Sequence, residues 1–185
     1  LVSNDTEIIQ WSERTGWAHL YRYDAEGKLL NAITKGEWHV SNVLGADDAK
    51  RVIYFTATGY NKDENPYYLH LFRVNYDGSG LKQLDPKDFN GEFSLSDDRR
   101  HFVTTYSRAD AAPVSELYTV EGKKVMTLAE VDLEPLFAMG YQYPEPFVVK
   151  AADGVTDLHG VMFKPYDFDP NKKYPIIEYV YPGPQ

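Results

Sequence analysis

Short apolar runs recur along most of the chain, and each is bounded by a segment rich in turn-forming residues. Runs of about four to eight residues with β-branched and aromatic side chains predict strands rather than helices. Only residues 128–139 carry a possible helical period, and Pro135 limits that helix to a turn or two. The predicted strands are 7–11, 17–23, 29–33, 38–44, 52–57, 67–74, 81–84, 92–95, 101–106, 116–120 and 125–128.

A short motif recurs along these predicted strands. Residues 19–23 (HLYRY) are echoed by residues 70–74 (HLFRV) and more faintly by residues 116–120 (ELYTV). The leucines of successive copies are 51 and 46 residues apart. Periods of roughly 40–50 residues that hold four strands are typical of β-propeller blades. At this point a β-sandwich with a coincidental similarity between strands is the alternative.

The repeat also indicates that the propeller is incomplete. Residues 7–129 hold one blade that lacks its first strand and then two full four-stranded blades. Propellers typically close with four to eight blades, because only a closed ring protects its sheet edges. The sequence therefore predicts that residues 1–139 are part of a larger propeller.

The pattern changes after residue 139. Pro144 and Pro146 flank Glu145 and hold the chain extended, as a linker does. Three further strands, predicted at 147–151, 158–164 and 176–181, do not fit the repeat. The last one runs into a Pro-Gly-Pro turn, so it either delivers its final side chain to a site at the sheet edge or simply ends a hairpin. Residues 140–185 are predicted to form a second, separate unit.

Composition and charge narrow the possible functions. The 185 residues include 19 Lys and Arg against 28 Asp and Glu, a formal charge of −9, which argues against a nucleic-acid partner. No apolar run reaches the roughly 18–20 residues of a membrane span. Cysteine is absent, which excludes disulfides and thiolate metal sites. The chain starts without methionine or a basic-then-apolar leader, and we expect it to begin within a longer protein.

Several acidic clusters invite a catalytic or metal-binding interpretation that their context disfavours. The pairs Asp47–Asp48 and Asp97–Asp98 lie between the first two strands of successive blades, so they are interpreted as turn residues. Asn75, Asp77 and Ser79 offer alternating oxygen atoms, but no Glu closes a twelve-residue calcium loop. No metal and no cofactor is predicted.

Four segments together resemble one family of serine peptidases. Residues 11–17 (WSERTGW) and 33–38 (ITKGEW) resemble the late propeller blades of dipeptidyl peptidase IV-type enzymes, members of the prolyl oligopeptidase family. Residues 160–165 (GVMFKP) and 180–184 (VYPGP) resemble the opening of that family's α/β-hydrolase domain. The resemblance implies a mainly β chain, with about two to three four-stranded blades followed by the first strands of an α/β-hydrolase domain.

The resemblance also implies an activity for the longer protein. Such an enzyme removes X-Pro or X-Ala dipeptides from the free N-terminus of a peptide by acyl transfer to a serine, without a cofactor. It implies a homodimer and a periplasmic, secreted or cell-surface location. The alternatives are a propeller scaffold or binding protein with a vestigial hydrolase-like end, and a prolyl oligopeptidase relative of different specificity. The Tyr-Pro-Gly-Pro sequence argues against the second, because His-Gly-Gly-Pro is common in those relatives.

One site residue follows from the resemblance. Tyr181 matches the tyrosine whose phenol donates to the oxyanion of the tetrahedral intermediate, whereas Tyr179, two residues earlier on the same face, is expected in the core. The sequence has no Gly-x-Ser-x-Gly, since Ser79 lies in a hairpin-turn string, so no nucleophile, base or orienting acid is assigned. Glu13 is interpreted as a turn carboxylate. The segment alone is expected to be inactive.

Overall fold

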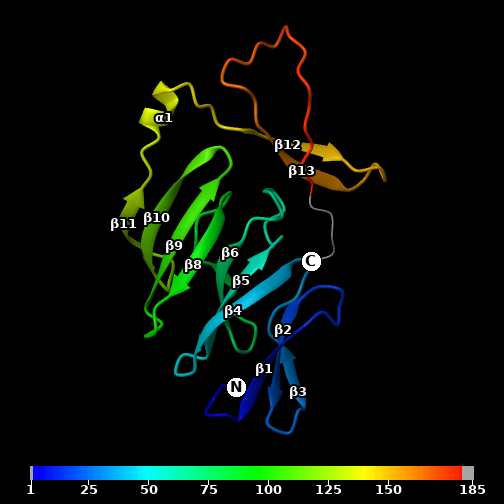
Figure 1. Ribbon diagram of the computed structural model, residues 1–185. Coiled ribbons are helices and arrows are strands. Elements are labelled where there is room, and N and C mark those ends of the chain that lie inside the picture. The colour runs from blue at the N-terminus through cyan, green and yellow to red at the C-terminus, as the bar shows by residue number, and fades with distance from the viewer. Residues whose placement is uncertain (1, 181–185) are drawn as a thin grey trace.

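A computed structural model describes residues 2–180, which fold mainly into antiparallel sheets (Figure 1). Three of the sheets follow one another along the chain, and we call them the first, middle and third blades. The first contains β1 (Glu7–Ser12), β2 (His19–Asp24) and β3 (Leu29–Ala32). The middle blade contains β4 (His39–Asp47), β5 (Val52–Thr58), β6 (His70–Asn75) and β7 (Lys82–Gln83). The third contains β8 (Asn90–Leu95), β9 (His101–Arg108), β10 (Ala111–Thr119) and β11 (Lys124–Glu130).

The predicted organisation of the blades is confirmed. Each blade runs in chain order from one edge to the other, and the first has three strands where the other two have four. The three copies of the repeated motif begin in β2, β6 and β10, the next-to-last strand of each blade. The missing strand of the first blade is therefore the one that would precede β1.

The middle blade is buried on both faces, which shows how the blades stack. Side chains alternate between the two faces of a strand. Ile53 and Phe55 of β5 pack with Leu20 of the first blade, whereas Tyr54, between them, packs with Phe102 of the third blade. Two apolar layers therefore hold three blades together, one on each side of β5.

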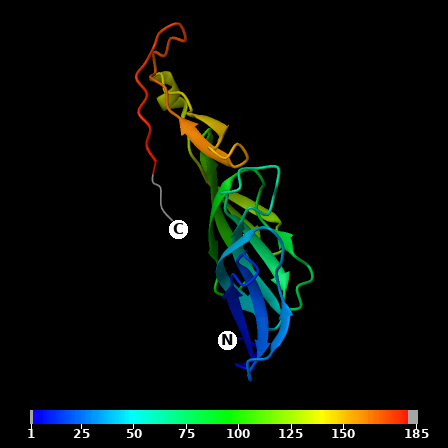
Figure 2. The ribbon, with the colours of Figure 1, turned by 90° about the vertical axis from the view of Figure 1, so that its right-hand side faces the viewer.

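The chain beyond the blades forms a short helix and a separate hairpin. The helix α1 (Glu134–Ala138) has Pro135 in its first turn, where proline is tolerated, and its single turn agrees with the sequence. β12 (Glu145–Lys150) and β13 (Asp157–Met162) then pair in an antiparallel hairpin. Figures 1 and 2 show this hairpin beyond one end of the blades.

The prediction of a last strand over 176–181 is wrong for the residues that the structure describes. Residues 176–180 are extended but form no strand, and Tyr179 is 91% exposed instead of lying in the core. An extended segment becomes a strand only when a neighbouring strand supplies hydrogen-bond partners. Nothing in residues 2–180 pairs with this segment. Tyr181 itself lies outside the described residues.

Within residues 2–180, no helix has the length and apolar character needed to cross a bilayer.

Candidate functional site

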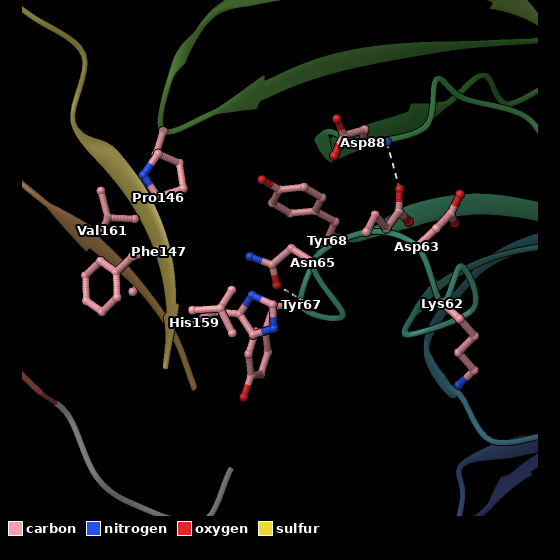
Figure 3. A pocket seen from close by; sticks show the side chains of 14 residues that line it. Lys62, Asp63, Asn65, Tyr67, Tyr68, Asp88, Pro146, Phe147, His159 and Val161 are labelled. Atoms are coloured by element: carbon pink, nitrogen blue, oxygen red, sulfur yellow. Dashed lines mark hydrogen bonds between the residues drawn. The ribbon is translucent and has the colours of Figure 1, made fainter. Parts of the chain in front are cut away.

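An open cleft lies between the middle blade and the β12–β13 hairpin (Figure 3). Its volume of about 660 Å³ is within the range of ligand-binding clefts. The β5–β6 connection, which we call the 59–69 loop, supplies a polar wall, and the hairpin supplies an apolar one. The lining residues are Lys62, Asp63, Glu64, Asn65, Tyr67, Tyr68, Asp88, Ala109, Pro146, Phe147, Val148, His159, Gly160 and Val161.

Tyr67 and His159 make the contact that joins the two walls. Their rings meet edge to face with centroids 5.9 Å apart, and Figure 3 shows them side by side. Tyr67 belongs to the 59–69 loop and His159 to β13. The position of the loop therefore determines how this wall of the cleft meets the hairpin.

Glu64 anchors the 59–69 loop to the blades. Its carboxylate accepts a hydrogen bond of 2.7 Å from the Asn61 amide and another of 2.7 Å from the backbone N–H of Asp88. One of its oxygens also lies 2.7 Å from Nε2 of His70, at the start of β6. The Glu64 side chain is 5% exposed, so these partners replace water almost completely.

His70 is held on its other side by Asp85. Its Nδ1 lies 2.7 Å from Oδ2 of Asp85, and the second oxygen of Asp85 accepts a 2.8 Å bond from the Leu71 N–H. Burial alone would lower the pKa of His70, but the hydrogen bond to Asp85 and the charges of Asp85 and Glu64 raise it above its usual value. Burial raises the pKa of Asp85, against the opposing effect of the His70 hydrogen bond. We call these three residues the Glu64–His70–Asp85 cluster.

In the first blade, His19 occupies the position that corresponds to His70, but its partners are uncharged. Nδ1 of His19 lies 3.0 Å from Oγ1 of Thr34, and that hydroxyl accepts a 2.9 Å bond from the Leu20 N–H. The other ring nitrogen of His19, Nε2, lies 2.8 Å from the carbonyl oxygen of Gly36. The histidine and its partner are 15 residues apart in both blades. The shared geometry indicates that the histidine joins its strand to the segment that follows the last strand of the blade, and that the middle blade has a charged version of this contact.

The cluster is suited to positioning rather than to proton transfer. Each ring nitrogen of His70 lies 2.7 Å from a carboxylate oxygen, and the His70 side chain is 1% exposed. A general base needs a free nitrogen within hydrogen-bond reach of the substrate. The carboxylates also lie at opposite edges of the ring, and residues 2–180 contain no group of three His, Asp or Glu side chains arranged to hold a metal ion.

The Glu64–His70–Asp85 cluster was not among the site residues predicted from the sequence. Two signals were present: the histidine that starts two copies of the repeat, and the equal spacing from His19 to Thr34 and from His70 to Asp85. Glu64 carried no such signal, because only the path of the 59–69 loop brings it to the ring.

Asp48, Asp97 and Asp98 lie in turns, as predicted, whereas Asp47 is the last residue of β4. Asp98 accepts hydrogen bonds of 2.7 Å from the Ser96 hydroxyl and 3.1 Å from the Arg100 N–H, and the Ser96 bond lowers its pKa. Asp48 opens the turn after β4 and accepts a 2.5 Å bond from the Tyr76 hydroxyl. Asp47, which ends β4, accepts a bond from the Lys50 N–H. These contacts give the carboxylates structural roles.

Of the other residues considered in the sequence, Glu13 and Ser79 lie in turns, and the predicted role of Tyr181 stays untested. Glu13 is exposed, and its carbonyl accepts a 2.8 Å bond from the Gly16 N–H, which closes the turn after β1. Ser79 donates to Asp77 and accepts from Asn75 within the β6–β7 turn. Tyr181 lies outside the described residues, so its role at the oxyanion stays a prediction.

The stacked blades, each with its strands in chain order, define this chain as a segment of a β-propeller followed by a separate hairpin. The crystal structure of dipeptidyl peptidase 4 from Porphyromonas gingivalis has the same fold, with a TM-score of 0.75 and 24% sequence identity. The similarity covers 94% of this chain and 24% of that one. Residues 1–113 match the sequence profile of the dipeptidyl peptidase IV N-terminal region, and the chain belongs to this family.

Curated relatives extend the similarity along the chain. The proteins named dipeptidyl peptidase 4 from Trichophyton equinum and Arthroderma otae are 33% and 32% identical to it, over 191 and 189 residues. Both matches cover 99% of this chain. The chain spans only 24% of the length of either relative.

Proposed function

We propose that this chain is part of a serine-type dipeptidyl peptidase that removes X-Pro or X-Ala dipeptides from the free N-terminus of peptides. The observation that carries the proposal is the match to proteins named dipeptidyl peptidase 4 over 99% of the chain, blades and hairpin together. Within the longer protein, residues 1–139 would form the last blades of the propeller and residues 140–185 the start of the hydrolase domain. A hairpin that is separate from the blades supports that division.

Tyr181 is the residue of this chain that we assign to the chemistry. A tyrosine phenol has an ordinary pKa of about 10, so it is neutral at pH 7 and can donate a hydrogen bond. A fixed donor aimed at the oxyanion stabilises the charge that develops in the transition state. The chain has no Gly-x-Ser-x-Gly sequence, so the nucleophile, base and orienting acid belong to the longer protein and the chain alone is inactive.

The test is hydrolysis of Gly-Pro-p-nitroanilide by the full-length protein and by its Tyr181→Phe variant. Loss of one oxyanion donor should lower kcat by about 10²- to 10³-fold. Tyr179→Phe is the matched control, because it removes a phenol only two residues away that has no assigned part in the chemistry. A full-length protein without dipeptidyl peptidase activity would support the scaffold alternative, and an unchanged kcat in Tyr181→Phe would remove Tyr181 from the mechanism.

We further propose that the longer protein is a homodimer located in the periplasm, at the cell surface or outside the cell. The support is the same family relationship. Light scattering on the full-length protein and fractionation of the source cells test the two parts separately.

A further inference from the structure

We propose that the 59–69 loop is a pH-sensitive latch on the cleft. A proton on His70 holds Glu64, and with it the loop, against the blades, and loss of that proton releases the loop. The inference rests on the geometry of the Glu64–His70–Asp85 cluster and does not depend on the proposed peptidase activity.

The charges around His70 explain why the latch needs a proton. Glu64 faces the ring from the loop, and Asp85 faces it from the segment after β7, each at 2.7 Å. With His70 protonated, one cation is shared by two nearly buried carboxylates. Once His70 is neutral, the carboxylates have no countercharge beside them, and leaving a buried charge without its partner is strongly destabilising.

The other groups near His70 do not supply a replacement charge. Gln83 of β7 places its amide nitrogen 3.0 Å from Nδ1 of His70, and an amide carries no charge. Tyr118 of β10 is close enough to feel the charge of Asp85, but burial and its hydrogen bond to Glu116 raise the pKa of Tyr118, so it stays neutral.

The local structure determines which carboxylate moves. Asp85 is held at the end of β7 by the Leu71 N–H, and its side chain is 1% exposed. Glu64 lies in a loop between two strands, so it can reach water by a loop movement that breaks no strand pairing. The loop is therefore the part that responds when His70 loses its proton.

The response reaches the cleft through Tyr67. This residue follows Glu64 by three positions and contacts His159 of the hairpin. Release of Glu64 also breaks its bond to the Asp88 N–H, the dashed line drawn to Asp88 in Figure 3. A neutral His70 therefore loosens both the polar wall of the cleft and its contact with the hairpin.

Hydrogen–deuterium exchange of the whole 185-residue chain tests the latch, from about pH 5 to about pH 9 and corrected for the intrinsic exchange rate. Protection of residues 59–69 should fall as the pH rises through the raised pKa of His70. The protection factor of these residues should fall about tenfold for each unit by which the pKa of His70 with the loop closed exceeds its pKa with the loop open. Residues 19–36 of the first blade serve as the internal reference, because His19 has uncharged partners. Equal pH dependence in both segments, or none in residues 59–69, would overturn the proposal.

Three variants separate the latch from general destabilisation. His70→Gln should leave the loop unlatched at every pH, and Glu64→Gln should remove most of the pH dependence while keeping a hydrogen-bonding side chain. His19→Gln is the matched control, and it should leave the pH response of residues 59–69 intact. A full pH response of the loop in His70→Gln would overturn the proposal.

A measurement on the unaltered chain covers the case in which His70→Gln does not fold. NMR titration of the His70 ring should give a pKa above its ordinary value of about 6.5, with loop signals shifting over the same pH range. An unshifted or lowered pKa, or loop signals that do not follow the ring, would refute the latch.

Discussion

The indole N–H of Trp11 donates a 2.7 Å hydrogen bond to the backbone carbonyl of Val40. Trp11 belongs to the first blade, and Val40 lies in the strand that opens the middle blade. The Val40 N–H in turn donates to the carbonyl of Ala18. The backbone N–H and carbonyl of buried Val40 are thus both satisfied by the neighbouring blade, which couples the blades by polar contacts as well as by apolar packing.

We expect Trp11→Phe to weaken this coupling. The variant keeps an aromatic ring but leaves the Val40 carbonyl without its donor, which should cost about 1–3 kcal/mol. Urea unfolding followed by circular dichroism measures the change. Trp17→Phe is the control, because Trp17 is as exposed (43% against 42%) and should change stability much less. Equal losses in both variants would mean that the hydrogen bond contributes nothing specific.

Gly78→Ala should destabilise the chain more than Gly27→Ala does. Both glycines have left-handed backbone conformations, with φ of +88° and +82°, so both variants incur a similar strain of about 1–2 kcal/mol. An added Cβ at Gly78 would lie 2.9 Å from the carbonyl oxygen of Ile33 in the neighbouring blade, whereas at Gly27 it would meet nothing within 4 Å. The difference between the two unfolding free energies therefore measures the close approach of the blades, and a difference of zero would contradict that approach.

Glu116 should make the third blade sensitive to acid. Burial alone would raise the pKa of Glu116, but its contacts with Lys124 and Tyr118 lower it below the ordinary value of about 4.3. Because the folded pKa is the lower one, the stabilisation is present above that ordinary value and is lost as the pH falls through the folded pKa.

The variant Glu116→Gln tests this contribution. It should be less stable at pH 7 by about 1–3 kcal/mol and should lose part of the decline in stability below pH 4.5. Urea midpoints between about pH 3 and about pH 7 provide the measurement. Glu92→Gln, on β8 of the same blade, is the exposed control. If stability declined identically at low pH in Glu116→Gln and in the parent chain, Glu116 would not be a source of the acid sensitivity.

The isolated chain should associate in solution. Large apolar side chains are exposed on several segments, with Ile176 and Ile177 each 93% exposed, and β1 is an edge strand with no further strand beside it within residues 2–180. Unpaired edges and apolar surface of this kind favour contact with other molecules. Multi-angle light scattering over a range of concentrations measures the effect, and a monomer at all concentrations would contradict the expectation.

Strand positions were largely readable from the sequence because they depend on local properties. Short apolar runs and the turn-rich segments between them predicted the blade strands, although residues 67–69 belong to the 59–69 loop. That error has a local cause, since the Tyr68 N–H bonds back to the Asn65 carbonyl and continues the loop. The failed strand over 176–180 has a different cause, because apolar, β-branched residues form a strand only beside a partner.

The sequence alone indicated that this chain is built from repeated four-stranded units and that its first unit lacks a strand, and it predicted a different unit after residue 139. Apolar runs and turn chemistry are properties of neighbouring residues, and repetition is a property of the order of amino acids, so the sequence is enough to express all three. Only the tertiary structure decided that Ile53 and Tyr54 pack against different blades and that Glu64 meets His70. These contacts join segments through space, and their formation depends on how the sheets stack and on the path of one loop.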